Sequence, residues 1–335
     1  MTSYTEQVGA KSRHGFNPLY TKFVLGELMG EGMDGILWDK ICPKFEMDDP
    51  DGGQFMKIDE NIRRIGNSTA GDRWTPGTSP TTIDFTTSLA TYKLYESAKA
   101  IEYNYKDLKT SLLGEKLPTV KLTQLAWWIA HNMERDYITA MTNTTFFSNN
   151  TTLVTATQWD NFASATSNPR SVARTAWLSI ATKTGGAIRG AKAIIPLEVF
   201  AYLKDHPQIK NDPDALKMYT NNTGRLFDTW DFWVPFVNYF SGQEEATFGS
   251  YTSAWGKDVI FYGEERVSLA NTDVEAFVGP VALLWNNYMG KGLIQIKGAM
   301  WNEDLETNKV NGHIRPHQFK QMHAGSSYVV KSAVS

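Results

Sequence analysis

The chain has a single cysteine, Cys42, among its 335 residues, so it cannot form a disulfide within itself. We therefore expect it to fold and assemble in a reducing compartment. It also lacks any apolar run that approaches the length of a membrane span, and its first six residues are polar, unlike the start of a signal peptide. These absences argue against a membrane protein and against an extracellular binding module.

An excess of charge of one sign is also missing. The chain has 33 Lys and Arg against 36 Asp and Glu, for a net charge of −3. A dedicated nucleic-acid binder needs a basic face to neutralise phosphates, so the balance argues against that class. The length, by contrast, is enough to bury a large core, which we expect to be divided into two lobes.

Three histidines near the C-terminal end come closest to a metal site, because zinc favours imidazole ligands. They are His313, His317 and His323. Pro316 would interrupt the helical turn needed to bring the first two to one face, and no acidic or thiol ligand stands at a recognisable spacing. We expect surface or interface histidines here, and a metal-dependent enzyme remains the alternative from a different class.

The other polar motifs are weaker still. Residues 185–190 form a glycine-rich turn that enters a strand and lacks the Lys-Ser/Thr ending of a phosphate-binding loop. Residues 48–53 lack the ligand spacing of a calcium loop, which predicts a solvated turn. Cys42 has no neighbouring histidine, so we expect a buried or docked thiol, and Glu264 and Glu265 are expected in a turn. The sequence thus predicts no catalytic, metal or cofactor site.

A long polar arm spans residues 54–95. Residues 55–65 mix scattered apolar side chains with charges, and residues 66–71 and 75–80 are so dense in turn formers that the chain must reverse there. The return limb, residues 81–95, is rich in β-branched and aromatic side chains. One of its faces carries Ile83, Phe85, Thr87 and Leu89. Because an isolated two-stranded ribbon is marginal in water, we expect this one to lie on a partner subunit.

The rest of the chain predicts both helices and strands. Residues 1–53 form an irregular segment that docks across a surface, with Ile36, Leu37 and Trp38 among its apolar anchors. Residues 118–143 predict the longest helix, because apolar side chains recur every three or four positions. A second helix is expected from a Ser171 cap to Gly185-Gly186. The later expected elements are a strand at 191–195, a helix at 197–204, and strands at 230–235, 255–262, 276–278, 293–297 and 328–330.

This order of elements resembles the major capsid proteins of tailed bacteriophages, the Hong Kong 97-type fold. The most specific match is residues 191–207, a strand followed by a helix that ends in a Leu-Lys-Asp-His-Pro turn. Trp255-Gly256-Lys257 before a hydrophobic strand and a last strand at 327–334 support it. The resemblance implies an α+β fold. Its parts would be an N-terminal arm (1–53), an extended loop (54–95), a peripheral domain (96–155 and 276–335) with the spine helix at about 118–143, and an axial domain (156–275).

The resemblance also implies a function. Members of the family form hexamers and pentamers that tile an icosahedral shell around packaged double-stranded DNA. It implies a homo-oligomer without enzymatic activity or cofactor, assembled in the host cytoplasm with a separate scaffolding protein, a portal and in some cases a decoration protein. Contact with the packaged DNA would be non-specific, which suits a near-neutral subunit. The near rival within this class is the shell of an encapsulin nanocompartment.

Two groups of residues are candidates for the subunit interface. The first is the mixed set of side chains on the arm: Lys57, Asp59, Glu60, Arg63, Arg64, Asp72, Arg73 and Trp74. Their charges could pair with a neighbour and set its register, or they could keep a solvated ribbon edge from aggregating. The second is Trp230 and Trp233, in a segment with more aromatic residues than one strand face can bury. That segment is expected to serve as core and interface alike.

Overall fold

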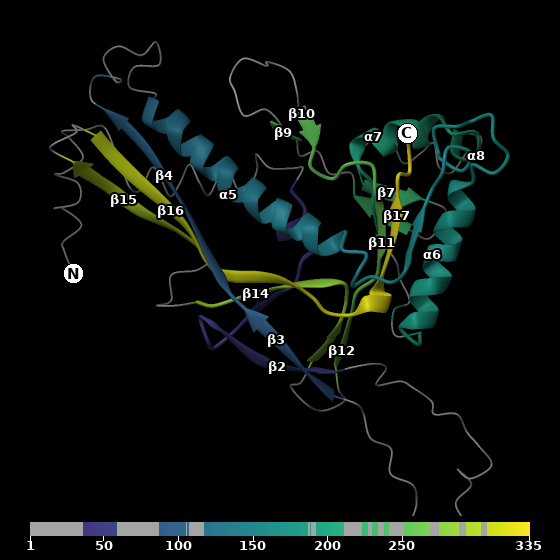
Figure 1. Cartoon of the computed structure of the whole chain (residues 1–335), viewed down its shortest axis with the longest axis horizontal. Helices are drawn as coiled ribbons and strands as arrows, with labels where there is room; N and C mark the ends of the chain where they lie inside the picture. The colour runs from purple at the N-terminus through teal and green to yellow at the C-terminus, as the bar shows by residue number, and fades with distance from the viewer. Residues whose placement is uncertain are drawn as a thin grey trace, which may run out of the picture. The chain divides into compact units, whose positions relative to one another are not determined.

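The computed structural model of the chain contains both helices and strands, as expected (Figure 1). It divides into two compact units. The first comprises residues 1–53, 93–137 and 283–319, and the second comprises residues 54–92, 138–282 and 320–335. The residues that the structure describes are 36–58, 87–104, 106, 117–186, 188, 192–210, 223–226, 230–233, 238–240, 251–268, 275–287, 293–302 and 307–335. The limits expected for peripheral and axial domains stay predictions.

The longest helix, α5, spans Leu117–Met141, which confirms the helix predicted at 118–143. Its apolar positions recur at helical spacing, and the side chains at these positions are at most 2% exposed: Leu122, Leu125, Ile129, Met133 and Tyr137. Beyond Met141 the Thr142 hydroxyl donates to the Ile138 carbonyl at 2.8 Å, and Asn143 Oδ1 accepts from the Thr145 amide at 3.0 Å. These bonds close the helix end with polar groups.

A five-stranded sheet accompanies α5 in the first unit (Figure 1). Its strands, in the order β1-β14-β16-β15 with β4 also paired to β16, are β1 (Lys44–Glu46), β14 (Val281–Trp285), β16 (Thr307–Gln321), β15 (Ile294–Asn302) and β4 (Tyr95–Asn104). Strand β16 is antiparallel to both β15 and β4. A Cβ on Gly312 of β16 would lie 3.1 Å from side-chain atoms of Leu125 and Ile129, so glycine lets α5 approach the sheet closely.

The N-terminal segment of the described chain is anchored in the first unit. Ile36, Leu37 and Trp38 are buried, as expected of apolar anchors, and Trp38 begins the short helix α3 (Trp38–Ile41). The fully buried Glu134 of α5 accepts hydrogen bonds through Oε2 from the amides of Leu37 (3.1 Å) and Trp38 (3.0 Å). A carboxylate from a distant helix therefore satisfies amides that the four-residue helix cannot satisfy by itself.

A six-stranded sheet forms the centre of the second unit. Its order is β5 (Asn150–Thr152), β17 (Ser327–Lys331), β11 (Val259–Tyr262), β6 (Lys192–Ile194), β8 (Trp230–Trp233) and β7 (Thr223–Leu226). Helices α6 (Pro169–Lys183) and α7 (Leu197–Asp205), the latter followed by the short α8 (Pro207–Lys210), share one apolar core with this sheet. That core includes Ala176, Ile180, Val199, Val259 and Val330. The strand predicted at 191–195 and the helix predicted at 197–204 are confirmed as β6 and α7.

Several predicted boundaries were wrong. Helix α6 is capped by Asn168, whose Oδ1 accepts from the Ser171 amide at 2.8 Å, and Pro169 takes the first position, so Ser171 is not the cap. Its expected end is confirmed, because Gly185 and Gly186 follow it with φ angles of 57° and 76°.

The strand predicted at 255–262 begins only at Val259, because residues 254–257 form a turn in which Gly256 has a φ of 60°. The strand predicted at 293–297 extends to Asn302. Strands β4, β14 and β16 were not predicted.

Three two-stranded sheets complete the described strands. They are β2 (Gly52–Ile58) with β3 (Thr87–Lys93), β9 (Asn238–Phe240) with β10 (Tyr251–Ser253), and β12 (Glu265–Ser268) with β13 (Glu275–Val278). Among the described residues no helix has the length and apolar character needed to span a membrane. The thiol of Cys42 is buried, as expected.

Candidate assembly surface

The described base of the predicted arm is a two-stranded ribbon. Strands β2 and β3 pair with each other and join neither the five-stranded nor the six-stranded sheet. One face of the ribbon is apolar: Tyr92 is 9% exposed there, and its ring lies 6.2 Å from that of Phe55. Leu89, at a position of opposite parity on β3, is 67% exposed. The ribbon thus presents a large apolar side chain to its surroundings.

The predicted interface residues fall largely outside the described part of the chain. Lys57 lies in β2, while Asp59, Glu60, Arg63, Arg64, Asp72, Arg73 and Trp74 lie outside the described residues, as do Ile83 and Phe85. Trp230 and Trp233 are the ends of β8, between β6 and β7 in the six-stranded sheet. Phe232 of the same strand is buried, and its ring is 5.5 Å from that of Phe200. The proposed roles of these residues stay predictions.

The three histidines of the metal hypothesis each make a different contact. His313 Nδ1 is 3.2 Å from Glu96 Oε1 across the β16–β4 pair, and His323 Nδ1 accepts from the Gly325 amide at 3.1 Å. The buried His317 has its Nδ1 2.8 Å from the Arg315 carbonyl oxygen. His313 and His317 lie on a strand, which the sequence did not predict. Within the described residues, no three His, Cys, Asp or Glu side chains are grouped to hold a metal ion.

A second pair resembles catalytic machinery more closely. His206 Nε2 lies 3.3 Å from the hydroxyl of Ser167, and both residues are buried. A general base would need an unprotonated Nε2. His206 Nδ1, however, accepts from the Gln208 amide at 3.2 Å, which leaves the proton on Nε2, and the Ser167 hydroxyl donates to the Gln158 carbonyl at 2.7 Å. The pair therefore links two loops and does not activate a nucleophile.

Burial lowers the pKa values of two buried histidines. Burial lowers the pKa of His206, although a hydrogen bond with the Ser167 backbone acts in the opposite direction. Burial likewise lowers the pKa of His317, against the effects of the Arg315 carbonyl and the Asp136 carboxylate. Both rings are thus held neutral near pH 7.

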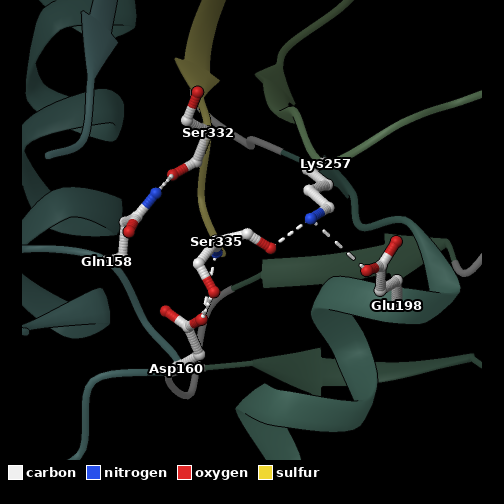
Figure 2. Close-up of polar contacts among 6 residues, drawn as sticks. All are labelled: Gln158, Asp160, Glu198, Lys257, Ser332 and Ser335. Atoms are coloured by element: carbon white, nitrogen blue, oxygen red, sulfur yellow. Dashed lines mark hydrogen bonds and ion pairs between the residues drawn. The ribbon is translucent and has the colours of Figure 1, made fainter. Parts of the chain in front are cut away.

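Residues 332–335 are held in the second unit by polar contacts (Figure 2). Asp160 Oδ2 accepts from the Ser335 amide at 3.0 Å and also from its hydroxyl. Lys257 Nζ donates to the Ser335 backbone oxygen and lies 3.7 Å from Glu198 Oε1. Burial acts to raise the pKa of Asp160, but the hydrogen bonds from Ser335 outweigh it and lower that pKa. These contacts fix the chain that follows β17.

Two further features of the surface are the ion pair of Lys192 with Glu264 and the exposed face of α6. Glu264 lies in the connection between β11 and β12, as predicted, and its Oε1 is 2.8 Å from Lys192 Nζ. Glu265 was predicted in the same turn but begins β12. On α6, Trp177 and Leu178 are 41% and 49% exposed. On the same helix the smaller Ala173 and Ala176 are buried. No local signal in the sequence marked Trp177 and Leu178 as an exposed pair.

No model of a known protein family matches the chain, and no curated protein matches it. Solved structures do. A phage-related protein from Bordetella bronchiseptica RB50 superposes with a TM-score of 0.62 at 15% identity, covering 93% of this chain and 97% of that one. The capsid of the cyanophage P-SCSP1u gives a TM-score of 0.51 at 9% identity, covering 89% and 88%.

A virus-like particle from Pyrococcus furiosus gives a TM-score of 0.50 at 10% identity, covering 93% of this chain and 96% of that one. All three matches extend over most of both chains, so the likeness concerns the whole fold and not one motif. The chain therefore has the fold of tailed-phage capsid proteins, as the resemblance of its sequence predicted.

Proposed function

We propose that the chain is the major capsid protein of a tailed phage, a subunit that assembles into hexamers and pentamers of an icosahedral head around double-stranded DNA. In this proposal residues 1–53 act as the N-terminal arm and residues 54–95 as the extended loop of the Hong Kong 97-type fold. The protein acts through the geometry of its contacts and not through an active site.

The observation that carries the proposal is the ribbon formed by β2 and β3. A two-stranded ribbon has too little apolar contact to be stable in water by itself, and this one presents Leu89 with 67% of its surface exposed. A neighbouring subunit that covers the ribbon would bury this side chain. The capsid fold supports the same conclusion, because such shells are built from many copies of one chain.

Charge is consistent with a container for DNA. With 33 basic and 36 acidic residues, the subunit would not neutralise many phosphates and would leave the genome free to move during filling. We propose that assembly takes place in the host cytoplasm with a separate scaffolding protein and a portal, and that a decoration protein can be added to the finished head. The DNA contacts in this proposal are non-specific.

Negative-stain electron microscopy of the chain, purified alone and co-expressed with a candidate scaffolding protein, tests the proposal. Closed particles of uniform diameter are the expected result. A monodisperse monomer under both conditions, at concentrations well above those used for other shell proteins, would contradict it.

A second candidate within the same class is the shell of a protein-filled compartment, as in encapsulins. It is kept because the chain resembles a virus-like particle from Pyrococcus furiosus as closely as it resembles the cyanophage capsid, with TM-scores of 0.50 and 0.51. The two candidates differ in what the particle encloses. Nuclease-protected DNA in purified particles supports the phage head, whereas a co-purified protein cargo without DNA supports the compartment.

A further inference from the structure

One face of α6 has the composition of a protein-binding surface. Trp177 and Leu178 are 41% and 49% exposed, and Arg174, three and four positions earlier, lies on the same side of the helix. Arg170 is one further turn back and is also exposed. We call these four residues the α6 patch. The 15 residues of the helix include two arginines and Lys183 but no acidic residue.

The chemistry of the α6 patch favours an acidic protein segment over a nucleic acid. Trp and Arg are the residue types most enriched at energetically dominant positions of protein interfaces. An exposed Leu178 beside Trp177 supplies apolar area that a phosphate backbone cannot use, whereas the two arginines pair well with carboxylates. An open pocket at the start of the helix, lined by Arg170, Arg174 and Gln208 among others, gives carboxylate side chains room to enter.

The chain itself carries a suitable acidic segment. Residues 46–51, which we call the acidic turn, have the sequence Glu-Met-Asp-Asp-Pro-Asp, and all four of its acidic residues are exposed. Lys44, two positions earlier, is already paired with Asp39 at 2.5 Å. The acidic turn therefore presents four carboxylates and no basic side chain.

Hydrogen bonds to its backbone hold the acidic turn in place. The buried Asn286 donates through Nδ2 to the carbonyls of Met47 (2.5 Å) and Asp48 (3.0 Å). The Met47 amide donates to the Trp285 carbonyl at 2.7 Å, and Asp49 Oδ1 accepts from the Asp51 amide at 3.0 Å. A segment ordered before binding loses less conformational freedom on binding, which suits it to dock.

We infer that the acidic turn of one copy docks on the α6 patch of the next copy. The inference deepens the proposed shell function and rests on it. Since the two surfaces are different, each copy uses its turn on one neighbour and its patch on the other, and such head-to-tail contacts close into rings. Charge complementarity sets which surfaces meet and in which register, and the contact weakens as salt screens it.

Charge reversal in two separate chains tests the inference. One variant carries Arg170→Glu and Arg174→Glu, and the other carries Asp48→Lys and Asp51→Lys, which leaves the Asp49 hydrogen bond within the turn intact. Each changes the charge by four units at exposed positions, so both are expected to fold, which circular dichroism and thermal melting check. Each variant alone is expected to give at least tenfold fewer particles than the unchanged chain at low salt. Lys210→Glu, an exposed reversal outside the patch, is the control and should assemble normally.

Mixing the two variants is the decisive experiment. If the two variants alternate around a ring, each contact joins either two unchanged surfaces or two reversed ones, and both kinds are complementary. Even-membered rings are therefore expected to return, while five-membered rings are not. A contact made within one chain would not be restored by mixing. The chain that carries all four substitutions should form closed particles again.

The outcomes separate the inference from the proposed function. If the unchanged chain forms shells and both variants do so equally well, or if the mixture assembles no better than either variant, the inference is wrong and the shell function stands. If the arginine variant forms shells that only lose DNA, the α6 patch binds nucleic acid and the inference is also wrong. If the unchanged chain never assembles, both fail.

Discussion

The five-stranded sheet with α5 and the two-stranded ribbon of β2 and β3 differ in how far they bury their apolar side chains. Leu125 of α5 is 1% exposed and faces the sheet, whereas Leu89 of the ribbon is 67% exposed. The first region is stabilised by contacts within the chain. In the second, Leu89 stays exposed although Tyr92 of the same strand is buried. Under the proposed shell function, a neighbouring subunit would cover the exposed part of the ribbon.

Removing a buried side chain between α5 and the five-stranded sheet should have the largest effect on stability. Leu125→Ala leaves a cavity between α5 and the sheet, and is expected to lower the free energy of unfolding by about 3 kcal/mol. Chemical denaturation of the unassembled chain measures this. A loss below about 1 kcal/mol would show that α5 does not depend on this contact.

The link between α5 and the N-terminal segment should come next. Glu134→Ala leaves the amides of Leu37 and Trp38 without their acceptor in a buried site, and a loss of about 2 kcal/mol is expected. Glu134→Gln keeps an oxygen in place and should lose less, which makes it the matched control. Equal losses for the two variants would mean that the carboxylate charge, and not the hydrogen bonds, is what matters.

The close approach of α5 to β16 gives a smaller effect. Gly312→Ala places a methyl group 3.1 Å from the side chains of Leu125 and Ile129, and is expected to cost about 1 kcal/mol through overpacking. In the Leu125→Ala background the added methyl has room, so the double variant should be more stable than the sum of the single changes predicts. Simple additivity in a double-mutant cycle would contradict this packing.

Acid should weaken folding through the buried histidines. Burial lowers the pKa of His206 and of His317 in the folded chain, so the unfolded chain binds protons first as the pH falls. Stability is therefore expected to be constant above about pH 7 and to decrease below the ordinary histidine pKa of 6.5. Thermal melting across pH 5 to 8 tests this, and the decrease should be smaller in His206→Gln. A melting temperature that rises toward pH 5.5 would contradict it.

Removing an exposed apolar side chain from the ribbon should affect assembly and not the stability of the unassembled chain. Leu89→Ala is expected to change the free energy of unfolding of the unassembled chain by less than about 0.5 kcal/mol, because the side chain is mostly exposed. It should nevertheless lower the yield of assembled particles. Val154→Ala removes a side chain of similar exposure, 64%, from another part of the chain and should change neither quantity. Normal assembly of Leu89→Ala would remove the contrast between the two regions.

Local periodicity explains which elements the sequence could predict. Helix α5 was predictable because its apolar residues recur at helical spacing, and β6 with α7 because a short apolar run ends at Pro196 before a helix. Strand β16 was missed because its apolar residues are sparse (Val310, Ile314 and Phe319) and because Pro316 interrupts it at a shift in pairing register with β4. A polar strand of this kind depends on partners far away in the sequence.

The candidate surface shows the same limit. The sequence predicted a ribbon that needs a partner, because turn formers and β-branched residues are local signals. It did not predict the α6 patch, since Trp177 and Leu178 have the composition of a buried helix face. Only the sheet that packs on Ala173, Ala176 and Ile180 determines which face of α6 points outward. Whether Trp230 and Trp233 contact a neighbour stays a prediction.

Amide hydrogen exchange in assembled particles and in dissociated subunits shows whether a neighbouring copy covers the ribbon. If a neighbouring copy covers the ribbon, the amides of β3, residues 87–93, should exchange markedly more slowly in particles than in free subunits, while those of α5 residues 122–137 should be similar in both. Equal exchange of β3 in both states would contradict the account, because it would mean that no partner covers the ribbon.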